Sequence, residues 1–298
     1  MSGTTLVIGA TGILGGEIVR RLRADNRPAR GLVRVTSDRA KVEALEQAGA
    51  AIAIGDLKDS SSLAAALEGI THVVSTASST LSRSDGDSIE SVDRDGQLTA
   101  LTAAKDAGVE QFVLVSFPQA SVPFPLQDAK RAVEKALRAS SVPFTILQPS
   151  HFWEVWCSPP LGFDAHARKA RIFGDGNAPM NWVSFFDVAS AVVRSLGNPR
   201  ALNQTFSIGG PQALSQNEMV RVFEEAGGQP FEREHVPLEA LQAQHAASAD
   251  SLERSFAALM LMVASGEWIF DSASAREALG MEMTPLSAFA RHVYGASA

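Results

Sequence analysis

Apolar and polar positions alternate in blocks along the first two-thirds of the chain. Apolar runs of strand length occur at residues 6–8, 29–34, 51–54, 72–76, 112–116 and 144–147. Between them apolar residues recur at helical spacing, as in Leu14, Ile18 and Leu22, within segments 38–48, 88–107 and a shorter one that Ser60 can cap. Strands that alternate with helices are typical of a parallel sheet covered on both faces. The pattern therefore predicts an α/β fold with a doubly wound parallel sheet.

The pattern changes in the last third. Residues 150–180 contain several aromatic side chains, a Pro-Pro pair and little periodicity, which predicts a loop-rich pocket wall. Residues 184–196 read as a helix capped by Ser184 or Asp187, and residues 204–208 read as a strand. Ser215 and Glu218 form a capping box, and Thr284-Pro285 opens a last helix. We expect a nucleotide-binding domain at 1–150, completed by 183–208, and a smaller discontinuous substrate-binding region at 151–182 and 209–298.

Composition narrows the class of protein. The only cysteine among the 298 residues, Cys157, excludes an internal disulfide and fits a reducing compartment. We find no run of about 20 apolar residues and no signal peptide, and the histidines lack metal-ligand spacing. The net charge of -7 without a long basic run argues against nucleic acid. We expect a cytoplasmic protein with no metal, nucleic-acid or membrane partner, which acts on a small molecule as a monomer or homodimer.

The most informative motif follows the first predicted strand. Residues 9–15 contain three glycines with the spacing Gly9, Gly12, Gly15, and a helical pattern follows at once. The first glycine allows a tight turn, the second a close approach of backbone to phosphate, and the third close packing of helix and sheet. The free N–H groups at the helix N-terminus favour an anion. The motif predicts a Rossmann-type dinucleotide site that includes Thr11, Ile13 and Leu14.

The residue that ends the second strand selects between the two nicotinamide cofactors. Here it is Arg34, whose guanidinium matches a 2′-phosphate, whereas a ribose hydroxyl needs an acceptor. Ser37 and Arg39 are candidates to complete the phosphate cradle. We therefore expect NADP(H) rather than NAD(H), unless Arg34 is an ordinary solvated charge. Asp56, after the third strand, either accepts from the adenine amino group or caps the next turn.

Six motifs in order resemble the NmrA-like branch of the atypical short-chain dehydrogenases/reductases, from the first strand to about residue 228. They are Gly9-Ala-Thr-Gly-x-x-Gly15, Gly55-Asp-Leu57, Ala129-Lys-Arg-Ala-Val-Glu134, Phe144-Thr-Ile-Leu-Gln-Pro149, the segment 181–189 and Ser207-Ile-Gly-Gly-Pro211. The resemblance implies a nicotinamide cofactor across the strand ends, in contact with the glycine loop, Arg34, Leu57, Thr76, Ala77, Ser116, Phe117, Pro149, Ser150 and Phe152. Members include isoflavone-reductase-like and quinone-reducing enzymes, and redox-sensing regulators that bind the cofactor without turnover.

Short-chain dehydrogenases usually protonate substrate through a tyrosine four residues before a lysine. Here Leu126 precedes Lys130 by four, and the only tyrosine, Tyr294, lies near the C-terminus. The resemblance implies that Lys130 holds the nicotinamide ribose or acts as the acid or base itself, as in the isoflavone-reductase-like members. The alternative is a surface lysine paired with Glu134.

Two further side chains are candidates for the chemistry. Ser116 ends a strand where a catalytic serine would stand, or it only forms a turn. His151 follows the next strand, where its imidazole either replaces the missing tyrosine as proton donor or packs without a chemical role. Substrate contacts are expected from His151 and from an aromatic wall, which otherwise belongs to the core of the smaller region: Trp153, Trp156, Phe163 and Trp182.

The residues together favour an NADPH-dependent reductase that transfers hydride to a small apolar or aromatic, electron-poor substrate such as a quinone, enone or carbonyl. The loss of the tyrosine favours such acceptors, because the anion that develops on them is less basic than an alkoxide. The alternative is a non-catalytic NADP(H)-binding redox sensor.

Overall fold

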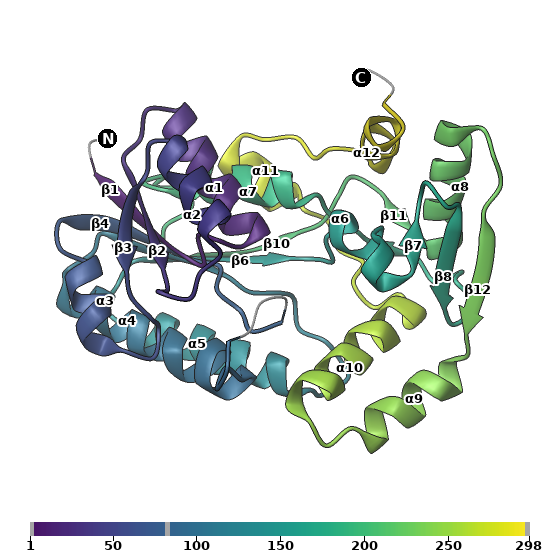
Figure 1. Cartoon of the computed structure of the whole chain (residues 1–298), viewed down its shortest axis with the longest axis horizontal. Helices are drawn as coiled ribbons and strands as arrows, with labels where there is room; N and C mark the ends of the chain where they lie inside the picture. The colour runs from purple at the N-terminus through teal and green to yellow at the C-terminus, as the bar shows by residue number, and fades with distance from the viewer. Residues whose placement is uncertain (1–2, 81–83, 296–298) are drawn as a thin grey trace.

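The centre of the molecule is a seven-stranded sheet in which every neighbouring pair is parallel (Figure 1). The computed structural model describes residues 3–80 and 84–295. The strands are β1 (Thr4–Ile8), β2 (Ala29–Val33), β3 (Ala51–Ile54), β4 (Ile70–Ser75), β5 (Gln111–Val115), β6 (Phe144–Pro149) and β10 (Gln204–Ile208). Their spatial order is β10-β6-β5-β4-β1-β2-β3. From β1 the chain adds β2 and β3 toward one edge of the sheet, and from β4 onward it adds strands toward the other edge. Open α/β sheets bind ligands at this switch point between β1 and β4.

Helices cover both faces of this sheet, as the alternating pattern predicts (Figure 1). One face carries α1 (Ile13–Ala24), α2 (Arg39–Gln47), α7 (Phe185–Ser195) and α11 (Ala273–Leu279). The other carries α3 (Ser60–Ala66), α4 (Gln97–Asp106) and α5 (Pro125–Ala139). Each face buries its own apolar cluster, one around Ile18 and Val192 and one around Leu63 and Leu137. The α/β, doubly wound prediction is confirmed.

The segment expected as one helix over 88–107 consists of two different helices. A π-helix, η1 (Ile89–Gly96), precedes α4. Ser88 begins it with a capping box, since its Oγ accepts from Ser91 N at 3.0 Å and Ser91 Oγ accepts from Ser88 N at 2.9 Å. Gly96 ends it against the backbone turn after β3, where a Cβ would lie 2.9 Å from Leu57 Cβ. The wider winding sets which side chains of this segment face the strand ends.

Local capping agrees with the sequence in part. Ser184 caps α7 through Phe186 N at 3.2 Å, and Ser215 and Glu218 form the expected box at α8 (Gln216–Gly227). The cap of α3 is Asp59 rather than Ser60, because the Asp59 carboxylate reaches Ser61 N at 3.0 Å while Ser60 is already helical. The last helix, α12 (Leu286–Val293), follows Thr284-Pro285 as expected.

The remaining elements form a second, smaller layer beside the sheet (Figure 1). It contains α6 (Trp153–Trp156), η2 (Pro159–Leu161), β7 (Phe163–Asp164), β8 (Lys169–Phe173), β9 (Met180–Asn181), β11 (Ala213–Leu214), β12 (Glu232–Val236), α8, α9 (Leu238–Ala247), α10 (Ser251–Ser265) and α12. Residues 150–180 are thus more regular than expected, because β8 is enclosed between β7 and β12 in its own sheet. A third apolar cluster unites this layer with Leu126 and Ala129 of α5. Within residues 3–80 and 84–295, no helix is both long and apolar enough to span a membrane.

Candidate functional site

The glycine loop has the geometry that a bound pyrophosphate requires. A Cβ on Gly15 would lie 2.1 Å from Gly9 O, and Gly9 itself has φ of 84°. Gly12 is the N-cap of α1 and is exposed together with Ile13, and as a glycine it has no side chain to occupy the N–H groups of the first helical turn. That turn carries no acidic side chain. Thr76 and Ala77 border the loop, because a Cβ on Gly9 would meet Thr76 Oγ1 and Ala77 N at 2.8 Å. The loop therefore fits the pyrophosphate of a dinucleotide.

Arg34, beyond the end of β2, belongs to a cluster of charges. Its Nη1 donates to Asp87 Oδ2 at 2.5 Å, and Lys58 Nζ donates to Asp87 Oδ1 at 2.6 Å. Ser37 Oγ accepts from Arg34 N at 2.9 Å, so Ser37 shapes the turn that carries the guanidinium. Arg39 instead pairs with Glu43 along the exposed side of α2. The side chains of Arg34, Lys58 and Asp87 together carry one positive charge beyond the ends of β2 and β3.

Asp56 and Leu57 follow β3. Asp56 Oδ1 accepts from Lys58 N at 2.8 Å, which is the turn-capping arrangement. Leu57 is buried and packs against η1.

Lys130 is buried and is paired with an acid that sequence spacing does not indicate. Its Nζ lies 3.2 Å from Asp93 Oδ1, with side chains 7% and 0% exposed. Asp93 Oδ2 in turn accepts from Ser79 N and Oγ at 3.0 and 2.8 Å. The ammonium is therefore held at the carboxyl end of β4. The alternative partner, Glu134, is occupied by Arg131 at 2.8 Å and by other donors.

Ser116 lies at the end of β5 and is bound by Arg131. Arg131 Nη2 donates to Ser116 Oγ at 3.0 Å and also to the Phe117 carbonyl. The guanidinium sits 5.6 Å from the Phe117 ring centroid. Burial lowers the pKa of Arg131, against the opposing effect of Glu134. Arg131 thus fixes the backbone turn after β5, and the Ser116 hydroxyl still has a proton to donate.

His151 follows β6 and is surrounded by indole rings. Its ring centroid lies 4.6 Å from that of Trp156, 5.8 Å from Trp182 and 4.8 Å from Trp268. The residue is 6% exposed, and among the described residues neither ring nitrogen has a hydrogen-bond partner. Burial lowers the pKa of His151 to about 3, so the imidazole is neutral at neutral pH. Such a group has one donor and one acceptor available to a ligand.

The other predicted contacts fall into two groups. Pro149 ends β6, and the buried Ser150 and the half-buried Phe152 follow it toward His151. Trp153 and Phe163 lie in the smaller layer, where Trp153 stacks on Phe289 at 6.4 Å and Phe163 packs edge-on against Phe223 at 4.8 Å. The structure thus brings Trp156 and Trp182, but neither Trp153 nor Phe163, into ring contact with His151.

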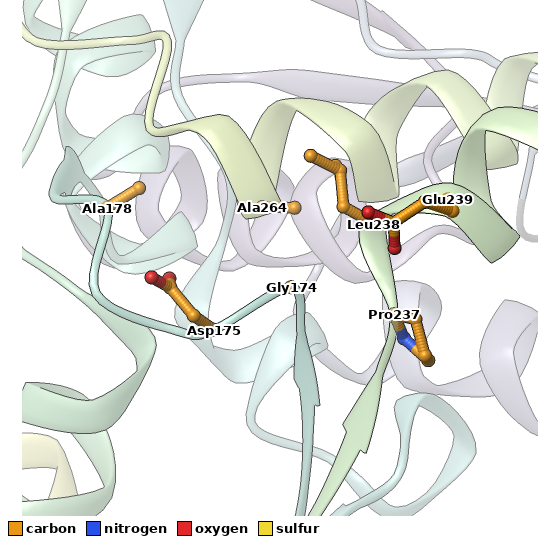
Figure 2. A pocket seen from close by; sticks show the side chains of 7 residues that line it. All are labelled: Gly174, Asp175, Ala178, Pro237, Leu238, Glu239 and Ala264. Carbon is orange, nitrogen blue, oxygen red and sulfur yellow. The ribbon is translucent and has the colours of Figure 1, made fainter.

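A separate hollow lies in the smaller layer (Figure 2). Its volume is about 660 Å³, and it is lined by Gly174, Asp175, Ala178, Pro237, Leu238, Glu239 and Ala264. Its two charged side chains, Asp175 and Glu239, are both acidic, which disfavours the phosphates of a dinucleotide. The strand ends of the main sheet remain the candidate site.

Five residues of this site have no signal of their own in the sequence: Lys58, Asp87, Asp93, Arg131 and Trp268. Trp268 contacts residues that follow two different strands. Its ring centroid is 5.8 Å from that of Phe117, after β5, and 4.8 Å from that of His151, after β6. It comes from a segment without regular structure, so no periodicity points to it. Arg131 stands beside Lys130 in the Ala129–Glu134 motif, and this adjacency is the only feature of the sequence that places any of the five near the site.

Comparison with known proteins identifies the family of this chain. Residues 1–290 match the model of the NmrA-like family. An NAD(P)H azoreductase of Xenophilus azovorans is 30% identical over 262 residues, 86% of this chain and 84% of that protein. A photosystem II assembly factor of Trieres chinensis is 30% identical over 239 residues, 78% of this chain and 72% of that protein. An NADPH-dependent quinone oxidoreductase of Escherichia coli, solved with NADPH, superposes with a TM-score of 0.78 at 20% identity, covering 97% of this chain and 99% of the other. With its match to the family model over nearly its whole length, this chain belongs to the NmrA-like family.

Proposed function

We propose that this protein is an NADPH-dependent reductase that transfers hydride to a small, flat, electron-poor substrate such as a quinone, enone or carbonyl compound. The observation that carries the substrate class is His151. A neutral imidazole with two unpartnered ring nitrogens, within the described residues, is enclosed by Trp156, Trp182 and Trp268. Apolar walls with a single polar group at their centre suit a planar molecule that carries one reactive oxygen.

The cofactor fits the same edge of the sheet. β1 and β6 are separated by β4 and β5, which is three strand spacings or about 14 Å. The backbone after β1 would hold the pyrophosphate, and Arg34 would hold the 2′-phosphate of the adenosine. The nicotinamide nucleotide would then extend past β4 and β5 toward His151. When bound there, the nicotinamide supplies the hydride. The azoreductase and quinone oxidoreductase relatives, named for NAD(P)H and NADPH, support this cofactor.

His151 acts on the substrate oxygen as a neutral group. Its N–H donates a hydrogen bond to the oxygen on which negative charge develops, and this requires no imidazolium. A quinone or enone yields a weakly basic anion, which a hydrogen-bond donor stabilises until water protonates it. Among carbonyl compounds a plain ketone is the poorer acceptor, because it yields a more basic alkoxide. Lys130, whose Nζ lies 3.2 Å from Asp93 Oδ1, orients the ribose hydroxyls next to the reacting ring.

Turnover tests this proposal directly. Purified protein, NADPH and a panel of quinones and enones are mixed, and the loss of NADPH absorbance is followed. We expect turnover that falls at least tenfold in His151→Phe while NADPH affinity is kept. The matched control is His166→Phe, an exposed histidine in the smaller layer, which should behave as wild type. Arg34→Ala should weaken NADPH far more than NADH, and an equal loss for both would refute the 2′-phosphate role.

A redox sensor is the second candidate. The similarity to a photosystem II assembly factor, at the same 30% identity as the azoreductase, favours a role other than catalysis. The turnover assay, together with a measurement of NADPH binding, separates the two functions. NADPH binding with no oxidation across the whole panel would overturn the reductase and support the sensor.

A further inference from the structure

Asp87 connects two cations that come from different strand ends. Arg34 follows β2 and Lys58 follows β3, and each donates to a different oxygen of this carboxylate, at 2.5 and 2.6 Å. Ser84 N donates to Oδ2 at 2.9 Å, so both oxygens are engaged. The Asp87 side chain is 1% exposed, while those of Arg34 and Lys58 are 29% and 34% exposed. The carboxylate therefore lies beneath the two cations, which reach solvent above it.

This arrangement leaves one unit of positive charge, since two cations share one carboxylate. Hydroxyl groups lie in the same segments as Arg34 and Asp87. Thr36 Oγ1 and Ser84 Oγ are 3.4 Å apart, and Ser37 lies in the turn of Arg34. Two cations with neighbouring hydroxyls are the donor set that a phosphate monoester requires.

We infer that Lys58 is a second ligand of the cofactor's 2′-phosphate, and that Asp87 is a positioning residue which holds Lys58 and Arg34 at one phosphate-sized separation. The inference rests on the proposed function only in taking the phosphate to be that of NADP(H). Held cations lose less conformational entropy when the phosphate binds, which favours affinity. Because NAD(H) lacks that phosphate, Asp87 and Lys58 set selectivity between the cofactors although neither is part of the glycine motif.

Asp87 could instead imitate the phosphate and compete with it. Its burial and its full set of partners argue against displacement, since moving it would leave a carboxylate or its donors unpaired. Burial raises the pKa of Asp87, but the hydrogen bonds from Lys58, Ser84 and Arg34 outweigh this and bring it to about 2. The carboxylate thus stays ionised beneath the cations at any pH where the cofactor is studied.

Lys58→Met tests the second ligand, with Lys105→Met as the matched control. Both variants replace one lysine by methionine, but Lys105 is exposed in the last turn of α4. Affinities for NADPH, NADH, 2′-AMP and 5′-AMP are measured by calorimetry. We expect Lys58→Met to weaken NADPH and 2′-AMP about tenfold and to leave NADH and 5′-AMP unchanged. Unchanged NADPH affinity, or an equal loss in Lys105→Met, would overturn the role of Lys58.

Asp87→Asn tests positioning against competition. We expect it to weaken NADPH and 2′-AMP about three- to tenfold, with NADH unaffected and part of the loss restored in Asp87→Glu. Tighter NADPH binding would show a competitor, and an equal loss of NADH would show a merely structural role. Since 2′-AMP binding needs no turnover, absence of reductase activity would leave this inference standing. Conversely, if the protein oxidises NADPH but Lys58→Met does not change its affinity for NADPH, this inference is wrong and the reductase function stands.

Discussion

Lys130 Nζ lies 3.2 Å from Asp93 Oδ1, and both side chains are almost completely removed from solvent. Two elements create this contact, since Lys130 belongs to α5 and Asp93 to the π-helix η1. A buried pair of this kind is costly to break from one side only. An activity test on Lys130 alone would therefore confuse a loss of fold with a loss of chemistry.

Replacement of Lys130 by methionine should destabilise the protein by about 3–5 kcal/mol, because it leaves the Asp93 charge buried without a partner. The double variant Lys130→Met/Asp93→Asn removes that charge and should recover at least half of the loss. Urea unfolding measures the free energy of unfolding of the single and the double variant. If the single and double variants unfold at the same urea concentration, the pair has no structural role. NADPH affinity of the double variant then reports the ribose contact of Lys130 without the instability.

Gly15→Ala and Gly16→Ala form a matched test of the glycine loop. The added Cβ at residue 15 would lie 2.1 Å from the backbone oxygen of Gly9, whereas at residue 16 it would meet Ala10 O at 3.4 Å. We expect Gly15→Ala to cost roughly 1–3 kcal/mol and to weaken NADPH, because helix α1 must move away from the loop. Gly16→Ala should be neutral or stabilising by up to ~1 kcal/mol, since alanine favours a helix.

Thermal unfolding and NADPH titration of the two variants give the comparison. Equal behaviour of the two alanines would contradict the close packing of α1 on the loop.

Leu126→Tyr places a tyrosine four residues before Lys130, at the position usual for short-chain dehydrogenases. It should not raise turnover. Leu126 is buried in the apolar cluster that includes Ala258 and Leu261 of α10, and its N–H donates to Ser255 Oγ at 3.2 Å. The larger ring should cost roughly 1–3 kcal/mol by overpacking.

Leu126→Phe carries the same ring without the hydroxyl and is the control. Both variants should have the same stability and the same rate of NADPH oxidation. A higher rate in the tyrosine variant would show that residue 126 reaches the reacting atoms.

The sequence predicts those features that arise from neighbours along the chain. The strand ends, the glycine loop and the Ser215–Glu218 box are local patterns, and each is found in the structure. β8 is not predicted although its side chains alternate between exposed and buried from Lys169 to Ile172, because residues 150–180 as a whole show little periodicity. β12 had no signal, since its residues Glu232–Val236 are mostly polar and exposed.

The site depends on contacts between distant segments, which periodicity does not encode. Asp93 meets Lys130 only because η1 winds as a π-helix, and the apolar spacing over 88–107 does not distinguish this from an α-helix. Asp87 reaches Arg34 across 53 positions. The predicted roles of Lys130, Ser116 and His151 therefore stay predictions, while their contacts with Asp93, Arg131 and Trp268 are known only from the structure.

The neutral state of His151 predicts an acid-sensitive fold. Burial lowers the pKa of this imidazole from its ordinary value of 6.5 to about 3. Between these values the unfolded chain takes up a proton that the folded chain refuses, so the free energy of unfolding falls as the pH falls below 6.5. The loss is at most ~1.4 kcal/mol per pH unit, or about 2 kcal/mol between pH 6.5 and pH 5.

His151→Phe should keep the aromatic packing and remove this dependence. The carboxylate of Asp87 does not interfere, since its pKa is lowered to about 2 and its contribution is lost only below its ordinary value of 3.8. His72, whose pKa burial also lowers, adds a slope of the same sign in both proteins. Glu154 and Asp187, whose pKa values burial raises, add slopes of the opposite sign in both proteins, so the comparison isolates His151. Urea unfolding of wild type and His151→Phe at pH 7 and pH 5 measures the difference. If both proteins lose the same stability between these pH values, the fold does not lower the pKa of His151, and burial is not what keeps this imidazole neutral.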